Sequence, residues 1–157
     1  MGDPALNYVY ENIDTLKPDL VIKKSEISFL PGQNNIGDTV SITAIIRNNS
    51  IIDIGSSFYV ACYLSDPELT GSVKLDSILV DSLSGYVADT LSFTWKTTGF
   101  DPGYKKIYID LDIHDSIDEL SENNNANYSK IVLTGSLLSG YKSNSFSWLK
   151  SVLSEFL

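Results

Sequence analysis

Apolar and polar residues alternate along several short stretches between residues 19 and 133. In residues 40–47 every second side chain is apolar, and residues 107–114 repeat this pattern with isoleucine and leucine. A period of two is typical of a β-strand with one buried face. Clear alternation predicts strands at residues 40–47, 58–64, 90–95 and 107–114, and weaker patterns predict three more at 20–29, 77–83 and 126–133.

Turn-forming residues separate these stretches. Pro31-Gly32, Asp66-Pro67 and Asp101-Pro102-Gly103 are examples, and no long helical pattern lies between them. About seven short strands joined by turns favour an all-β fold, an antiparallel β-sandwich, over residues 18–134. Four lysines are expected to guard edge strands against pairing with other chains: Lys23, Lys24, Lys105 and Lys106.

Both ends of the chain differ from this middle part. Residues 1–17 are an N-terminal extension with apolar residues at near-helical spacing, and residues 135–145 are rich in Ser and Gly and predict a linker. Residues 146–157 have the pattern of an amphipathic C-terminal helix, so short that it needs a surface to lie on. Its apolar stripe is the predicted partner interface: Phe146, Trp148, Leu149, Val152, Leu153 and Phe156.

The sequence leaves two possibilities for the surface on which this apolar stripe packs. The helix either folds back onto its own chain or docks on a partner subunit or domain, whereas a membrane surface is disfavoured because Lys150 and Glu155 do not form a basic row. The first and last strands are expected to run in opposite directions, with the terminal segments emerging at opposite ends of the sandwich. Packing of the two terminal segments on each other would then favour a head-to-tail or swapped oligomer.

Composition excludes several function classes. The chain has 157 residues, with 11 Lys and Arg against 20 Asp and Glu, and its net charge of -9 argues against nucleic-acid partners. No apolar run approaches the roughly 18 residues of a membrane span, and Met1–Pro4 begins no signal peptide. Cys62 alternates with apolar neighbours and is expected to be a buried, inert thiol, and His114 has no nucleophile motif beside it. We therefore predict that the protein is not an enzyme and needs no cofactor.

Six acidic residues lie between Asp110 and Glu122, and they allow two interpretations. The first is a calcium site with hard oxygen ligands, although an EF-hand loop starting at Asp110 lacks the required Gly and the final Glu. Its candidate ligands are Asp110, Asp112, Asp115 and Asp118. The second, favoured interpretation is a structural corner in which side chains bond local backbone groups. Its candidate residues are Glu119, Glu122, Asn124 and Asn125.

Exposed tyrosines offer a further candidate site. Tyr59 and Tyr63 lie on the polar face of one predicted strand, and Tyr108 lies on another. If these strands are neighbours, the rings could form a carbohydrate-binding surface. Trp95 continues the apolar face of its strand and is expected in the core.

Several of these residues resemble the CARDB family, the cell-adhesion-related domains found in bacteria and also in archaea. Pro18-Asp19-Leu20 matches the opening of the domain, and residues 91–95 match its aromatic strand. The most specific match is the family pattern Glu-x-x-Glu-x-Asn-Asn, which falls on residues 119–125. The resemblance implies an immunoglobulin-like sandwich that serves as a non-catalytic module of extracellular or cell-surface proteins. We therefore expect a binding, adhesion or spacer module with a protein partner, and a calcium- or carbohydrate-binding sandwich is the alternative.

Overall fold

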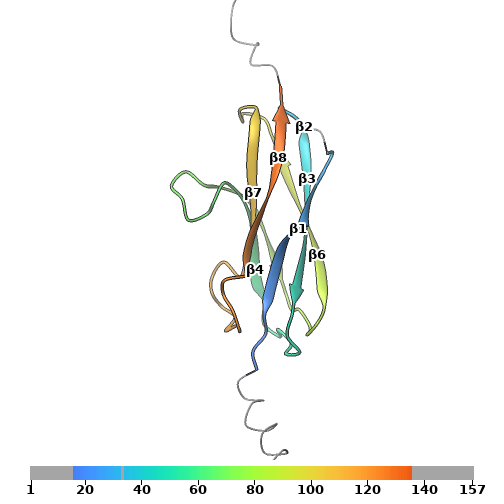
Figure 1. Cartoon of the computed structure of the whole chain (residues 1–157), viewed down its shortest axis with the longest axis vertical. Helices are drawn as coiled ribbons and strands as arrows, with labels where there is room; N and C mark the ends of the chain where they lie inside the picture. Colours follow the sequence, from blue (N-terminus) through green and yellow to red (C-terminus); the bar gives the residue numbers. More distant parts are fainter. Residues whose placement is uncertain (1–15, 33, 136–157) are drawn as a thin grey trace, which may run out of the picture.

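The computed structural model describes residues 16–32 and 34–135. Eight strands form within these residues, and the all-β immunoglobulin-like sandwich predicted from the sequence is confirmed (Figure 1). The predicted C-terminal helix at residues 146–157 lies outside the described residues, as do all but residues 16 and 17 of the N-terminal extension (1–17) and all but residue 135 of the linker (135–145). The strands are β1 (Leu20–Leu30), β2 (Asn34–Asn35), β3 (Thr39–Asn48), β4 (Phe58–Leu64), β5 (Val73–Val80), β6 (Ala88–Lys96), β7 (Gly103–Leu111) and β8 (Ala126–Thr134).

The strands form two facing sheets. One has three strands in the order β1-β3-β6, and the other has five in the order β2-β8-β7-β4-β5. All pairs are antiparallel except the two-residue strand β2, which pairs with β8 in parallel. In the part of the chain that the structure describes, no helix has the length and hydropathy to cross a membrane.

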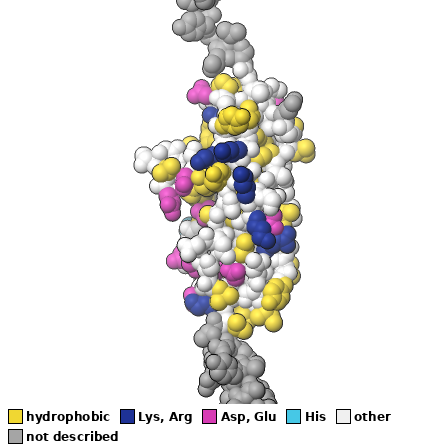
Figure 2. All heavy atoms as spheres, viewed as in Figure 1, with side chains coloured by type: hydrophobic (Ala, Val, Ile, Leu, Met, Phe, Trp, Pro, Cys, Tyr) yellow, Lys and Arg dark blue, Asp and Glu magenta, His cyan; other side chains and the backbone are white. Residues whose placement is uncertain are grey.

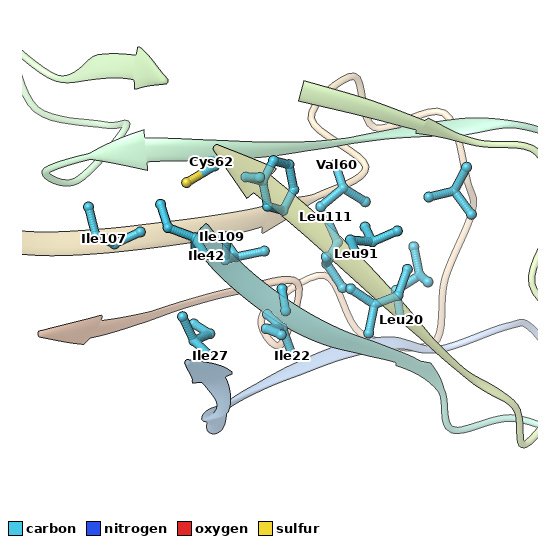
Figure 3. Packing of buried hydrophobic residues seen from close by; sticks show 14 of the residues in the cluster. Leu20, Ile22, Ile27, Ile42, Val60, Cys62, Leu91, Ile107, Ile109 and Leu111 are labelled. Atoms are coloured by element: carbon cyan, nitrogen blue, oxygen red, sulfur yellow. The ribbon is translucent and has the colours of Figure 1, made fainter. Parts of the chain in front are cut away.

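The core lies between the inner faces of the two sheets. Figure 3 shows Leu20 and Ile42 from the three-stranded sheet meeting Val60 and Ile109 from the five-stranded sheet, and all four are fully buried. Alternation supplies Ile42, Val60 and Ile109, because every second position on β3, β4, β6 and β7 faces inward. Trp95 is also buried, as the sequence predicted.

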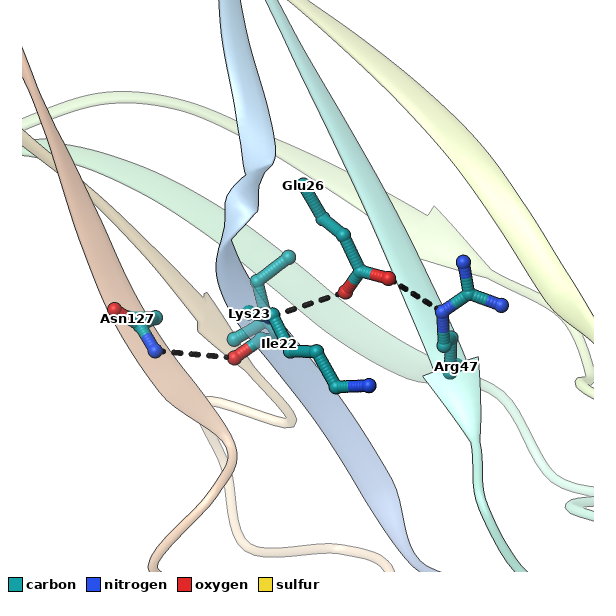
Figure 4. Close-up of polar contacts among 5 residues, drawn as sticks. All are labelled: Ile22, Lys23, Glu26, Arg47 and Asn127. Atoms are coloured by element: carbon teal, nitrogen blue, oxygen red, sulfur yellow. Dashed lines mark hydrogen bonds and ion pairs between the residues drawn. The ribbon is translucent and has the colours of Figure 1, made fainter.

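Strand β1 departs from simple alternation. The register with β3 shifts between Ile22 and Ile27, so residues 23–26 bulge outward. Glu26 accepts a hydrogen bond from the backbone N–H of Lys23 and pairs with Arg47 on β3 (Figure 4). On the other side of β1, Asn127 of β8 donates to the Ile22 carbonyl, which joins the two sheets at this edge.

The first and last long strands run in the same direction, contrary to the expectation of opposite directions. Figure 1 shows β1 starting at the lower end of the sandwich and β8 ending at the upper end. This shared direction places Leu16 and Gly135, the limits of the described chain, at opposite ends. The expected placement of the ends is therefore correct, but the reason given for it was wrong.

Three predictions about individual strands also need correction. Strand β5 covers Val73–Val80 instead of 77–83, and β7 ends at Leu111 instead of continuing to His114. Strand β7 also lies between β8 and β4, so Lys105 and Lys106 do not guard an edge. Lys23 and Lys24 do lie on an edge strand.

Candidate functional site

The motif residues 119–125 meet in a corner between β7 and β8. The backbone N–H of Leu20 donates to one oxygen of buried Glu119, and the other oxygen accepts from Asn125 Nδ2 at 2.9 Å. The same Nδ2 donates to Glu122 Oε2 at 2.9 Å, and Glu122 also accepts from the backbone N–H of Glu119. The side-chain amide of Asn125 thus bridges the carboxylates of Glu119 and Glu122 next to the start of β1.

Further contacts tie this corner to the first strand. Asn124 Nδ2 donates to Asp19 Oδ1 at 3.0 Å, and the backbone carbonyl of Asn124 accepts from the backbone N–H of Ile22 at 3.2 Å. The N–H of Leu120 donates to the Pro18 carbonyl at 2.9 Å. The acidic motif therefore fastens β1, which belongs to the three-stranded sheet, to the β7–β8 loop of the five-stranded sheet.

Burial next to other acids raises the pKa of Glu119 to about 7. The loss of hydration is the main cause, and the nearby charges of Glu122 and Asp112 add to it. Hydrogen bonds from Leu20 and Asn125 favour the ionised form and act in the opposite direction, but they do not outweigh burial.

The alternation along residues 107–114 predicts Asp112 on the solvent face of a strand, and this prediction is wrong. The backbone of Asp112 has φ +46°, which ends β7, and its side chain turns inward and is buried. The carboxylate accepts from the N–H groups of Ser116 and Ile117 at 2.8 and 2.7 Å and from the Ser116 hydroxyl at 2.6 Å. Asp112 therefore closes the loop that leads to Glu119.

The four candidate calcium ligands are spread over this region. Asp110 lies on the outer face of β7 and Asp112 closes the loop, whereas Asp115 is exposed and Asp118 pairs with Lys17. Within residues 16–32 and 34–135, no three His, Cys, Asp or Glu side chains are placed to hold one metal ion.

Three tyrosines form a row across the outer face of the five-stranded sheet. Tyr63 on β4 is the cross-strand partner of Tyr108 on β7, and Tyr108 is the partner of Tyr128 on β8. The rings of Tyr108 and Tyr128 are stacked, with centroids 4.9 Å apart, and Lys106 Nζ lies 4.8 Å from the centre of the Tyr128 ring. Tyr59 lies apart from this row, edge-to-face with exposed His114.

The β4–β5 loop, residues 65–72, projects beside this row (Figure 1) and forms two hollows with the sheet. The upper hollow, about 370 Å³, is lined by Asp66 and Leu69 of the loop and by Tyr104, Lys106 and Tyr108 of β7, among others. The lower hollow, about 260 Å³, includes Asp66, Glu68, Tyr108 and Asp110 in its lining. Asp66 and Tyr108 border both hollows, so together these form one continuous surface, here called the loop groove.

Charges of both signs lie along the loop groove. Figure 2 shows lysine side chains over β7 and β8 and acidic side chains beside the projecting loop. Burial, with the charges of Glu68, Asp112 and Asp66, raises the pKa of Asp110 to about 6. The pKa of Tyr108 is also raised, first by burial and then by the charge and hydrogen bonding of Asp66.

The residues considered for catalysis show no arrangement for it. Cys62 points into the core, where burial raises its pKa to about 12, so the thiol is inert (Figure 3). His114 contacts Tyr59, and no described nucleophile is hydrogen-bonded to it. The predicted interface residues in 146–157 lie outside the described residues.

Sequence reasoning missed the loop groove almost entirely. Asp66-Pro67 signalled only a turn, and the strongly exposed Tyr104 and Leu69 belong to no motif. The sequence predicted only that Tyr63 and Tyr108 would lie close together if their strands were neighbours, and these strands are neighbours. Tyr128 is added by the register of β8.

The architecture and the corner define an immunoglobulin-like β-sandwich module with no assembled catalytic group among its described residues. The CARDB family model matches residues 17–129, and the chain therefore belongs to the CARDB family. Members of this family are non-enzymatic modules. A search of curated proteins found no match.

Solved structures share the fold. A CARDB domain from Pyrococcus furiosus, described as a complex with di-metal ions, has a TM-score of 0.61 and 23% identity, covering 75% of this chain and 90% of that one. A domain of a protein predicted to lie at the cell surface of Methanosarcina acetivorans has a TM-score of 0.59 and 21% identity, with 77% and 96% covered. Part of a β-glucosidase from Erythrobacter marinus is also similar, with a TM-score of 0.54 and 13% identity, covering 74% of this chain but 16% of the enzyme. At these identities the similarity concerns the fold alone.

Proposed function

We propose that this chain is a spacer and binding module of a surface-associated or secreted protein. The observation that carries the proposal is the path of the chain, which enters the sandwich at one end and leaves it at the other (Figure 1). A module of this kind separates whatever adjoins its two ends. The nine residues of β8 alone span about 30 Å at roughly 3.3 Å per residue.

Contacts at the lower end support the proposal that the first strand resists tension. The corner holds residues 18–22 through Glu119, Leu120 and Asn124, so tension applied at the N-terminal side meets hydrogen bonds to the opposite sheet. Strand β1 is also fully paired with β3 along its two straight segments.

The spacer role predicts a fixed distance between the two ends. Spin labels placed at Lys17 and Gly135 through cysteine substitutions, with buried Cys62 left in place, report this distance by pulsed electron spin resonance. We expect one narrow distribution centred beyond about 30 Å. A broad or short distribution would contradict a rigid spacer.

We also propose that residues 146–157 supply the contact with a protein partner, on the basis of their amphipathic pattern. Light scattering of the full chain, compared with a truncation after Thr134, tests this. Association of the full chain alone supports docking on a second copy. If both are monomers of equal behaviour, self-association through this segment is excluded.

A surface location is proposed from family membership and from the Methanosarcina neighbour. Antibodies against the purified domain should label intact cells of the source organism. Labelling only after permeabilisation would place the protein inside the cell and overturn this part of the proposal.

A further inference from the structure

The loop groove is built before any ligand arrives. Within the β4–β5 loop, the N–H groups of Glu68 and Leu69 donate to Asp66, and Ser72 bonds back to Leu69. The N–H of Ser65 donates to the Lys106 carbonyl at 3.0 Å, which fixes the loop to β7. A loop held by its own hydrogen bonds loses little entropy on binding, so this surface is preorganised.

The polar groups of the groove alternate in sign over short distances. Lys106 borders the upper hollow, Asp66 borders both, and Glu68 and Asp110 border the lower one. In the described residues, none of these four side chains takes part in an ion pair. A ligand that follows this surface must therefore accept hydrogen bonds from an ammonium group and donate them to carboxylates nearby. A hydroxyl group does both, because it has one donor and two acceptor sites.

The upper hollow also offers flat apolar surface. Tyr104 is 80% exposed and Leu69 is 64% exposed, although both border the hollow. Tyr108 and Tyr128 each use one ring face in their mutual stacking, and Lys106 lies over the Tyr128 ring, whereas Tyr104 has no ring or cation contact among the described residues. Tyr104 is therefore the ring whose face is available to the C–H face of a sugar, and it replaces Tyr59, Tyr63 and Tyr108 as the expected stacking residue.

We propose that the loop groove binds a neutral, hydroxyl-rich glycan, with Tyr104 stacking on a sugar ring and Lys106, Asp66 and Asp110 bonding its hydroxyls. A polyanion is disfavoured because the carboxylates of Asp66, Glu68 and Asp110 border the groove and the chain carries a net charge of -9. This inference goes beyond the spacer role and does not depend on it.

Native gel electrophoresis of the full chain, in gels containing laminarin, galactomannan or hydroxyethylcellulose, tests the proposal. We expect at least one neutral polysaccharide to retard the protein, and Tyr104→Ala to weaken retardation by about tenfold, as loss of one stacked ring does. Tyr104→Phe keeps the ring and should retain binding. Tyr86→Ala removes a similarly exposed tyrosine, 74% against 80% for Tyr104, from the β5–β6 turn outside the groove, and serves as the matched control.

Three outcomes would overturn the proposal. The first is the absence of retardation by every neutral polysaccharide, and the second is an equal effect of Tyr104→Ala and Tyr86→Ala. The third is retardation by alginate alone, which would identify an anion-binding surface. Melting curves of each variant separate loss of binding from loss of folding, because all the substituted side chains are exposed. The distance measured between Lys17 and Gly135 is unaffected by any of these results, so failure here leaves the spacer role standing.

Discussion

Ionisation of Glu119 should cost the folded domain stability as the pH rises. The pKa of this carboxyl is 4.5 in an exposed chain and about 7 in the fold, chiefly because burial removes its hydration. A group with a raised folded pKa contributes full stability below its unfolded pKa and loses it as the pH passes through the folded pKa. For Glu119 that window runs from about pH 4.5 to about pH 7.

The size of the effect follows from the same values. Each pKa unit corresponds to about 1.4 kcal/mol, so the rise from 4.5 to about 7 corresponds to about 3 kcal/mol between pH 4.5 and pH 8. Glu119→Gln removes the titration but leaves an amide donor facing either Leu20 or Asn125, which costs about 1 kcal/mol at every pH. We therefore expect the two proteins to be about equally stable at pH 5 and the variant to be more stable by about 2 kcal/mol at pH 8.

Urea unfolding followed by circular dichroism at pH 5, 6, 7 and 8 measures how this difference in the free energy of unfolding grows with pH. Asp110, whose pKa is also raised, titrates in both proteins and cancels in the difference. Asp101→Asn removes one exposed negative charge from the β6–β7 turn and serves as the control for the change in net charge. If the free-energy difference between the natural protein and Glu119→Gln stays constant from pH 5 to pH 8, the argument from burial is refuted.

Three further perturbations test other parts of the fold. Asp112→Ala leaves the buried N–H of Ile117 without its acceptor, so it should lower the free energy of unfolding by about 2–3 kcal/mol. Urea unfolding at pH 7 measures this change, and a loss below about 0.5 kcal/mol would be inconsistent with a loop-closing role for Asp112. A Cβ at Gly85 would lie 2.4 Å from the Ile51 carbonyl oxygen, so Gly85→Ala should lower the melting temperature by several degrees, whereas Gly32→Ala, with open space around it, should not. Millimolar calcium should not raise the melting temperature, because the four candidate aspartates are dispersed over the described residues. A reproducible increase in the melting temperature would contradict this prediction.

The fold could be predicted because most strands have one buried face. Alternation located β3, β4 and β6 closely, since each has regular inward and outward positions. It failed on β5, where Leu75 has no partner on β4 and the alternation breaks at that bulge. It also failed past Leu111, because Asp112 keeps the strand alternation in sequence while its left-handed backbone turns the side chain inward.

The candidate site was predictable only in part, because its residues depend on tertiary placement. Tyr63 and Tyr108 lie 45 positions apart in sequence and become neighbours only through the pairing of β4 with β7. The importance of Tyr104 arises from the path of the β4–β5 loop, and no local pattern determines that path.

The strongest sequence signal and the proposed binding surface therefore belong to different parts of the molecule. In the corner, the side chains of Glu119, Glu122 and Asn125 form hydrogen bonds with one another and with the first strand, so few of their polar atoms remain for a ligand. The loop groove has the opposite character, because Lys106 and Asp66 take part in no ion pair among the described residues and Tyr104 is strongly exposed. Since β4 and β7 are anchored in the core and residues 65–72 are not, that loop can change in sequence without disturbing the corner. A sandwich built in this way can keep one fold while the loop varies, so a ligand for this chain should be sought at the loop groove, between residues 65–72 and the outer face of β7, and not at the acidic motif.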